Sequence, residues 1–302
     1  MRVFVTGGSG LTGPAVVAEL ITAGHTVTGL ARSDEAAARL RALGAQTLSG
    51  ALEDLDALQA GAAEADGVIH LAFGGSFADP EDLVRRDRTA IETLGRALAG
   101  SGKPFVSTSG TLVMPGGRVT AEDDAPDPGS IAWFRIPGEQ ACLAFAGQGV
   151  RSSVVRLAPT VHGPGDYGFI PMLIAAARKH GVSAYVGDGA NRWPAVHRLD
   201  AATLFRLALE QAPAGTPLHG AAENVTLRAI AEQVARSLAI PAVSLTPEQA
   251  AEHFGDPFMA GVYAADAPVS SDRTRTRLGW RPTHPTLLED IEAGDYCAPQ
   301  PV

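Results

Sequence analysis

The feature that constrains this chain most is a glycine-rich loop close to its first residue. Residues 6–14 read TGGSGLTGP and follow the short apolar run RVFV. Gly7, Gly10 and Gly13 are spaced by three, which puts residues without side chains where a strand turns tightly into a helix. Pro14 suits the first turn of that helix, because the amide it lacks has no partner there. The loop predicts a helix N-terminus that receives a phosphate group, with a purely structural turn as the alternative.

The order of elements places this loop in a larger pattern. Short β-branched runs alternate with Ala- and Leu-rich stretches of helical period, which is typical of an α/β protein with a parallel, doubly wound Rossmann sheet. Because the loop lies inside a β-α-β unit, a bound dinucleotide is favoured over a structural turn. Six or seven strands are expected, among them 3–6, 26–30, 47–49, 68–71, 105–108 and 153–157, with helices at 15–23, 35–43, 54–61, 82–99 and 138–147.

The second half of the chain shows a looser pattern. After residue 162 glycine and proline cluster and the expected elements become shorter, apart from an amphipathic helix at 227–238. We expect an NAD(P)-binding Rossmann domain over 1–162, with a later contribution from about 194–222. A smaller C-terminal substrate lobe is expected from 163–193 and 223–302.

Composition excludes several classes of partner. The chain has 33 acidic and 24 basic residues and no dense basic patch, so no nucleic-acid partner is expected. Cys142 and Cys297 are the only cysteines and lack ligand-spaced neighbours, so neither a disulfide framework nor a metal site is predicted. No apolar run approaches the roughly 18 residues that span a bilayer, and no signal peptide precedes the first strand. We therefore expect a cytoplasmic protein without a membrane partner.

The end of the second expected strand indicates which dinucleotide is bound. Ligands of open α/β sheets lie at the carboxyl ends of the strands, where the glycine loop, residues 71–73 and residues 107–111 should meet. An acid after the second strand would bind a ribose hydroxyl, whereas a base would bind a 2′-phosphate. Here Arg32 and Ser33 follow Ala31 and can both donate to a phosphate. NADP (NADPH) is predicted rather than NAD; the alternative is that Arg32 extends into solvent.

Further motifs follow the loop in a fixed order. They are VIHLA at 68–72, VSTS at 106–109, the stretch 156–165, WPAVHRLD at 193–200 and LGWRP at 278–282. With the loop, they resemble the extended short-chain dehydrogenase/reductases, most closely the NAD-dependent epimerase/dehydratase branch, over nearly the whole chain. The resemblance implies an NAD(P)-dependent oxidoreductase whose C-terminal lobe closes over a small-molecule substrate, and a homodimer formed through two paired helices.

The loop and this resemblance give a set of cofactor-binding residues. The glycines are expected to carry the pyrophosphate and residues 71–73 to pass the nicotinamide ribose. One departure is Ala51, which stands where relatives have an acid that contacts the adenine, so the backbone of Leu52 or the side chain of Asp54 is left for that contact. The full set is Thr6, Gly7, Ser9, Gly10, Leu11, Thr12, Gly13, Arg32, Ser33, Leu52, Leu71, Ala72, Phe73, Ser107, Arg135 and Pro159.

A second departure concerns catalysis. Members of the family normally use Tyr-x-x-x-Lys, in which the lysine lowers the pKa of the tyrosine so that it exchanges a proton with the substrate oxygen. Alignment of the stretch around Glu139 puts Ile131 at the tyrosine position and Arg135 at the lysine position, and no tyrosine of the chain precedes a lysine by four residues. The chain thus resembles atypical members without the dyad. Arg135 either orients the ribose and supplies positive charge or is a surface arginine.

Other side chains are candidates for the catalytic role. Ser109 matches the family serine that hydrogen-bonds the substrate oxygen, and Thr111 could share this role; alternatively both hydroxyls cap the loop. His162 has an intrinsic pKa suited to proton exchange near neutral pH, although packing beneath the cofactor is the favoured role for it. Tyr167 is a further titratable candidate near the crevice.

Three functions follow from these observations. The leading one is an NADP-dependent oxidoreductase that transfers hydride between NADPH and a small, partly apolar carbonyl substrate without the Tyr/Lys pair. The others are an NADP-binding redox sensor or scaffold without turnover, and a sugar-nucleotide epimerase or dehydratase, for which Arg192 matches a position that contacts anionic substrates. Apolar side chains that either line the substrate site or form ordinary core are Phe73, Phe77, Trp133, Phe169, Met172 and Trp193.

Overall fold

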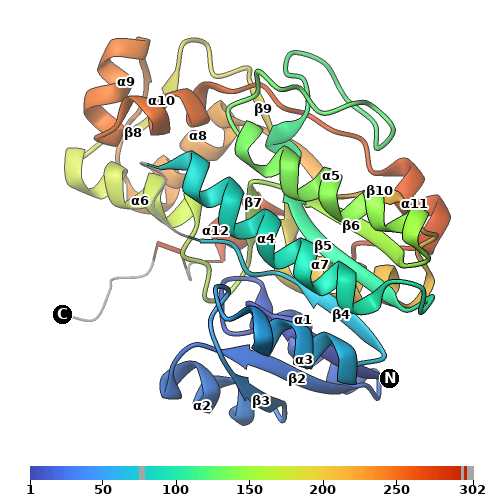
Figure 1. Cartoon of the computed structure of the whole chain (residues 1–302). Helices are drawn as coiled ribbons and strands as arrows, with labels where there is room; N and C mark the ends of the chain where they lie inside the picture. The colour runs from blue at the N-terminus through green and yellow to red at the C-terminus, as the bar shows by residue number, and fades with distance from the viewer. Residues whose placement is uncertain (75–78, 294–295, 298–302) are drawn as a thin grey trace.

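The protein is built around a seven-stranded parallel sheet (Figure 1). The structure is a computed structural model that describes residues 1–74, 79–293 and 296–297. Strand order is β10-β6-β5-β4-β1-β2-β3, so the order reverses beside β1, as in a doubly wound fold. The predicted fold is confirmed, with seven strands. They are β1 (Arg2–Thr6), β2 (Thr26–Ala31), β3 (Gln46–Ser49), β4 (Gly67–His70), β5 (Pro104–Gly110), β6 (Arg151–Leu157) and β10 (Thr216–Gly220).

Helices cover both faces of this sheet. One apolar cluster joins the strands to α1 (Gly13–Thr22), α2 (Asp34–Ala42) and α7 (Arg198–Gln211). The other joins them to α3 (Leu55–Glu64), α4 (Pro80–Leu98) and α5 (Ile136–Ala144). Because both faces are covered, β1 and β4 carry apolar side chains on both faces, with Val5 and Ile69 on one face and Phe4 and Val68 on the other.

Strand β1 shows how the sequence produces this packing. Val3 and Val5 face the α1 side, while Phe4 between them faces α3, in keeping with the two-residue period of a strand. A Cβ added to Gly61 in α3 would lie 2.5 Å from the Phe4 ring, so the absence of a side chain lets the helix approach the sheet. All three apolar residues before the glycine loop therefore pack against helices, on one face of the sheet or the other.

Helix ends differ from the expected ranges where capping residues decide them. Helix α4 begins at Pro80, two residues before the predicted start, because Asp79 accepts a hydrogen bond from the amide of Asp82 and proline fits the first turn. The helix expected at 138–147 is α5 followed by a separate 3₁₀ turn, η3 (Phe145–Gln148). The other 3₁₀ turns are η1 (Thr111–Val113) and η2 (Trp133–Arg135).

The later part of the chain builds smaller sheets and a separate apolar cluster. Strands β7 (Thr160–His162), β9 (Arg192–His197) and β11 (Glu223–Thr226) form one sheet, and β8 (Ser183–Val186) pairs with β12 (Ala242–Leu245). The predicted helix at 227–238 is α8 (Leu227–Leu238). The remaining helices are α6 (Phe169–His180), α9 (Pro247–Phe254), α10 (Pro257–Ala264), α11 (Asp272–Leu278) and α12 (Leu287–Glu292). Among all helices of the described residues, none has the length and apolar character needed to cross a bilayer.

Candidate active site

The glycine loop leaves β1 in a conformation that side chains would obstruct. Gly7 has φ of 73°, and a Cβ added there would lie 2.5 Å from the backbone nitrogen of Ala72. A Cβ added to Gly13 would lie 2.2 Å from the carbonyl oxygen of Gly7. The amide of Gly10 donates to that same oxygen at 3.0 Å. The loop thus packs its bare backbone against the segment that follows β4, as expected of a pyrophosphate cradle.

The helix that follows this loop presents a bare N-terminus. Thr12 is the N-cap of α1 but its side chain accepts no capping hydrogen bond, and the first turn carries no acidic residue. The first amides of a helix carry partial positive charge and normally find a partner. These features fit a dinucleotide held through its phosphates by residues 7–13.

The residues after β2 are placed to select the coenzyme. Arg32 is exposed and forms no hydrogen bond or ion pair with any part of the chain that the structure describes. Ser33 accepts from the amide of Ala36 at 3.2 Å, which leaves its hydroxyl proton for a ligand. Two groups were expected to contact the adenine, the Asp54 side chain and the Leu52 backbone. The Asp54 carboxylate already accepts a hydrogen bond from the amide of Ala57 at 3.1 Å as the cap of α3, so the backbone of Leu52 is the more available of the two.

Three buried hydroxyls lie at the carboxyl end of β5 and in the turn after it. Ser107, Ser109 and Thr111 are 1%, 3% and 0% exposed, and none of their hydroxyl oxygens has a hydrogen-bond partner among the residues that the structure describes. Buried hydroxyls are nearly always satisfied in folded proteins, so several orphans in one segment indicate a place where a ligand or ordered water completes the bonding. Ser107 and Ser109 lie on one face of β5, under α4 and α5.

Arg135 joins this group from η2. Its guanidinium lies 3.7 Å above the centre of the Phe73 ring, and Nη2 donates to the carbonyl oxygen of Thr108. Nη1 has no hydrogen bond and lies 3.8 Å from Asp87 Oδ1. Burial lowers the pKa of Arg135, but a guanidinium stays charged at neutral pH. Of the two interpretations of Arg135, a surface arginine is therefore wrong.

The position expected for the missing tyrosine holds an apolar side chain. Ile131 is partly buried against the apolar cluster of the C-terminal elements. It offers no proton to a ligand.

His162 is engaged elsewhere. Its ring is buried, with Nδ1 2.5 Å from Asp290 Oδ2 and an edge-to-face contact with His197 at 5.4 Å. Within the described residues, no hydrogen bond, ion pair or ring contact connects His162 with positions 107–111. The alternative to a catalytic role for His162, structural packing, accounts for these contacts.

Tyr167 and Pro159 are the other candidates from this region. Tyr167 is 65% exposed in the loop between β7 and α6, and an added Cβ on the neighbouring Gly168 would lie 3.6 Å from Leu11 Cδ2. This loop therefore borders the glycine loop, and Tyr167 is placed at the edge of the cofactor site rather than beside Ser109. Pro159 lies between β6 and β7, at the carboxyl edge of the sheet.

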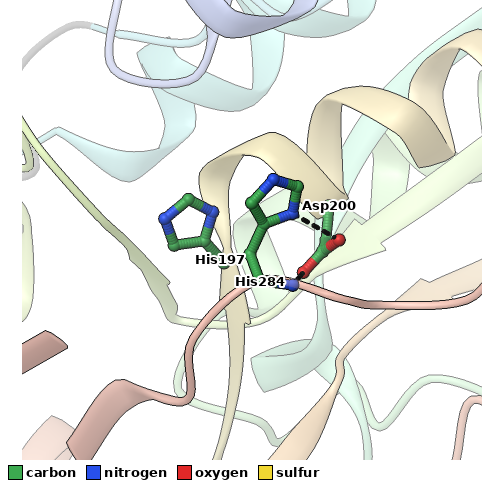
Figure 2. A group of neighbouring side chains, drawn as sticks. All are labelled: His197, Asp200 and His284. Atoms are coloured by element: carbon green, nitrogen blue, oxygen red, sulfur yellow. Dashed lines mark hydrogen bonds and ion pairs between the residues drawn. The ribbon is translucent and has the colours of Figure 1, made fainter. Parts of the chain in front are cut away.

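A histidine–aspartate cluster lies next to His162 (Figure 2). His197 and His284 stack at 4.8 Å with an interplanar angle of 10°, and the Asp200 carboxylate accepts from His284 Nδ1 and from the amides of Thr283 and His284. Imidazole coordinates metals in the plane of its ring, so two stacked rings do not converge on one ion. These hydrogen bonds hold the segment before α12 against the start of α7, which is a structural role.

The apolar and charged candidates for a substrate site separate into two groups. Trp193 is fully buried, stacks on Tyr263 at 5.4 Å and donates from Nε1 to Ala265, so it is core. Trp133 and Met172 are exposed, and Phe77 lies outside the described residues. Arg192 is paired with Asp266 through contacts of 3.0 and 3.1 Å, so its charge is already neutralised.

Sequence reasoning missed two residues of the site. His70 ends β4, beside Ser107 in the sheet register, and Asp87 lies in the middle of α4; both are buried and hydrogen-bonded to each other. Neither stands out in the sequence, since His70 ends a short apolar strand and Asp87 is flanked by arginines in a helix whose buried face is otherwise apolar.

Comparisons with known proteins agree with this geometry. The sequence model described as the NAD dependent epimerase/dehydratase family matches residues 3–219. A protein of Schizosaccharomyces pombe described as uncharacterised is 47% identical over 98% of this chain and 100% of its own length. A 4-hydroxy-2-methyl-3-oxo-4-farnesyl-3,4-dihydroquinoline-1-oxide ketoreductase of Stigmatella aurantiaca is 32% identical over 71% of this chain and 66% of its own length.

The fold is also found among solved structures. A dTDP-glucose 4,6-dehydratase of Streptomyces venezuelae, with NAD bound, matches with a TM-score of 0.80 and 19% identity, covering 98% of this chain and 96% of that one. With the glycine loop, the bare helix N-terminus and the family match in place, the chain belongs to the NAD dependent epimerase/dehydratase family of extended short-chain dehydrogenase/reductases, which are NAD(P)-dependent enzymes.

Proposed function

We propose that the protein is an NADP-dependent reductase of small carbonyl compounds. One observation carries the proposal: within the described residues the buried hydroxyls of Ser107, Ser109 and Thr111 make no hydrogen bond, and the guanidinium of Arg135 lies over Phe73 near the same strand end. Such convergent donors are what a carbonyl oxygen and a nicotinamide ribose need.

The choice of NADP is supported by the end of β2. Arg32 has no partner there within the described part of the chain, and a planar guanidinium matches a 2′-phosphate. The solved dehydratase was described with NAD, so the alternative coenzyme is NAD. Relative affinity for NADPH and NADH decides between them.

Each residue of the site is proposed to have a separate role in carbonyl reduction. The bound coenzyme supplies the hydride that reduces the carbonyl carbon. Ser109 is proposed to donate a hydrogen bond to the carbonyl oxygen and so to stabilise the negative charge that develops there. Arg135 adds a fixed positive charge in a buried environment, where electrostatic attraction is stronger than in water. Residues 7–13 and 71–73 hold the coenzyme in place.

The substrate is proposed to be a ketone or aldehyde without a diphosphate group. The Stigmatella aurantiaca relative, 32% identical to this chain, is a ketoreductase. Arg192, the residue expected to contact an anionic sugar nucleotide, is occupied by Asp266. A diphosphate would have to displace that carboxylate, which disfavours the epimerase or dehydratase alternative.

The test is a substrate panel with the purified protein. NADPH oxidation is followed by absorbance with ketones, aldehydes, imines and nucleotide sugars. Ser109→Ala is expected to lower kcat about 10²-fold, because an oxygen-stabilising donor is lost. Ser153→Ala is the matched control, since Ser153 is also buried and unpartnered but lies on β6 beside Val106, on the other face of the sheet.

The outcomes separate the candidate functions. Turnover of carbonyls that falls in the Ser109 variant and not in the control supports the reductase. Tight NADPH binding with no carbonyl turnover, and no epimerised or dehydrated product from the nucleotide sugars, favours the coenzyme sensor. Unchanged kcat in Ser109→Ala removes this residue from the mechanism.

A further inference from the structure

The loop between β7 and α6 is held in place by residues from other parts of the chain. Residues 163–168 read GPGDYG, and Gly163 and Gly165 have φ of 123° and 80°, a region that glycine enters more readily than other residues. Ordering a segment so rich in glycine costs more conformational entropy than ordering an average one. The position of the loop therefore depends on the contacts that fix it.

Asp166 joins the two ends of this loop. Its Oδ1 accepts from the amide of Gly168 at 2.6 Å, and its own amide donates to the carbonyl oxygen of Gly163 at 3.1 Å. Arg198, at the start of α7, donates a further hydrogen bond to the carbonyl oxygen of Pro164. These bonds define the shape of the loop and leave Asp166 Oδ2 for another partner.

The other partner of Asp166 is Tyr296, which lies after α12. The hydroxyl of Tyr296 donates to Asp166 Oδ2 at 2.7 Å and accepts from the amide of Gly163 at 3.0 Å. A single hydroxyl thus binds both the start and the middle of the loop. Immediately before the loop, His162 Nδ1 lies 2.5 Å from Asp290 Oδ2 on α12. The last part of the described chain therefore holds the loop at two neighbouring points.

On its other side the loop lies against the glycine loop, residues 7–13. A Cβ added to Gly168 would lie 3.6 Å from Leu11 Cδ2, an ordinary van der Waals distance. Pro164 and the first turn of α1 line one hollow of about 290 Å³. Movement of the 163–168 loop would therefore uncover one side of the segment that is expected to hold the pyrophosphate.

Tyr296 is suited to hold the loop rather than to exchange a proton with a substrate. Its proton is used in the bond to Asp166, and burial, with the adjacent carboxylate, raises the pKa of the phenol above its usual range. Among the described residues, no hydrogen bond links Tyr296 with Ser109 or Arg135. Its contacts thus assign it to the loop and not to the reacting centre.

We propose that Tyr296 positions the 163–168 loop against the glycine loop, and that this contact slows the release of bound coenzyme. The inference rests on coenzyme binding alone, which the proposed reductase and the sensor have in common, and it holds with or without turnover. Loss of the hydroxyl leaves Asp166 Oδ2 and the amide of Gly163 without this partner, so the loop moves away from Leu11 more often. The coenzyme then loses a neighbouring contact and dissociates faster.

The first experiment measures how fast the coenzyme leaves. Protein loaded with NADPH is mixed with excess NADP+ in a stopped-flow instrument, and the change in NADPH fluorescence gives the dissociation rate; NADH is treated in the same way with NAD+. Tyr296→Phe is expected to raise the dissociation rate about 10-fold, with the association rate changed by less than about 2-fold. Tyr185→Phe is the matched control, because Tyr185 on β8 faces Arg228 and its hydroxyl forms no hydrogen bond with the described residues. It should leave both rates unchanged.

A double-mutant cycle tests whether the effect passes through the contact with the glycine loop. Leu11→Ala removes the side chain that the 163–168 loop touches. If Tyr296 acts through this contact, Tyr296→Phe should have little further effect on the dissociation rate in the Leu11→Ala protein. Fully additive effects of the two substitutions would overturn the proposal, because Tyr296 would then act independently of Leu11.

Hydrogen exchange separates this role from simple anchoring of the chain near its end. Peptides that cover residues 163–168 are followed by mass spectrometry with and without NADPH. NADPH should slow their exchange in the wild type, and should do so less in Tyr296→Phe. If Tyr296→Phe does not fold, the wild-type measurement still decides, since a loop whose exchange does not respond to the coenzyme refutes the proposal.

The remaining outcomes distinguish this inference from the reductase function. An unchanged dissociation rate in Tyr296→Phe overturns the role of Tyr296, whether or not carbonyls are reduced. A wild-type protein that binds neither NADPH nor NADH overturns the coenzyme site and this inference together. Bound coenzyme without carbonyl turnover refutes the reductase alone, and the dissociation rates then remain the measure of Tyr296.

Discussion

Arg32 shows how much can depend on one exposed side chain. It follows β2 and forms no hydrogen bond or ion pair with the residues that the structure describes, so its guanidinium is available to a ligand. Charge-assisted hydrogen bonds contribute on the order of 1.5–3 kcal/mol, which corresponds to roughly 10- to 100-fold in affinity. We predict that Arg32→Ala weakens NADPH binding by this factor and leaves NADH binding unchanged, as measured by fluorescence titration of both coenzymes.

The control for this prediction lies on the next helix. Arg39 on α2 is also exposed and forms no ion pair with the described residues. Arg39→Ala should leave both affinities unchanged. If Arg32→Ala weakened the binding of NADPH and NADH equally, the side chain would support the fold of the loop and would not bind the 2′-phosphate.

At the scale of an element, the start of α1 depends on a glycine that no other residue can replace. A Cβ on Gly13 would lie 2.2 Å from the oxygen of Gly7 and 2.5 Å from the carbonyl carbon of Gly8, and both are backbone atoms that move only with the loop. Gly13→Ala should therefore lower the free energy of unfolding by about 1–3 kcal/mol and also weaken coenzyme binding.

Thermal unfolding and coenzyme titration of the same samples check this expectation. Gly147→Ala is the control, because a Cβ at Gly147 in η3 meets nothing within 4 Å. It should be neutral or slightly stabilising. If Gly13→Ala unfolds and binds like the wild type, the loop is more adaptable than its contacts indicate.

Elements were predictable from the sequence to the extent that local patterns define them. The alternation of apolar runs and helical stretches identified the parallel sheet, and the glycine spacing identified α1 and its turn. Asp79 and Pro80 moved the start of α4, since a cap is a feature of a few atoms that periodicity does not detect.

Site residues differ in the same way. Ser109 could be proposed as a candidate from a contiguous motif, whereas no motif of the sequence pairs His70 with Asp87. They are 17 positions apart and meet only because α4 folds back across β4 beside α5, as Figure 1 shows. From the sequence, Arg135 could be either a cation that orients the ribose or a surface arginine. Its position over the Phe73 ring excludes the surface interpretation.

At the scale of the whole molecule, a buried polar network ties distant segments together. Arg156 on β6 donates to Glu139 on α5 and to the backbone oxygen of Glu122, while Glu122 Oε1 accepts from the amide and hydroxyl of Thr274 on α11, each at 2.7 Å. His219 on β10 completes it. These groups connect the edge of the large sheet with a helix near the end of the chain.

The network fixes the protonation of His219 and so predicts how stability depends on pH. Nδ1 lies 2.8 Å from the carbonyl oxygen of Ser270, which can only accept, so Nδ1 carries the proton and Nε2 faces the Arg156 guanidinium. A second proton would meet that cation in a buried site, and burial first, then Arg156, lower the pKa of His219 to about 4. The unfolded chain keeps the ordinary value near 6.5.

Between these two values only the unfolded state binds the proton, so acid favours unfolding. The free energy of unfolding should fall as pH drops from about 6.5 to 4, by up to about 1 kcal/mol per pH unit from this group, and its contribution should level off below the folded pKa. Urea unfolding at a series of pH values, for the wild type and His219→Gln, measures it. The glutamine variant removes this titration, so its curve should be flatter by that slope; parallel curves would show that His219 titrates alike in both states.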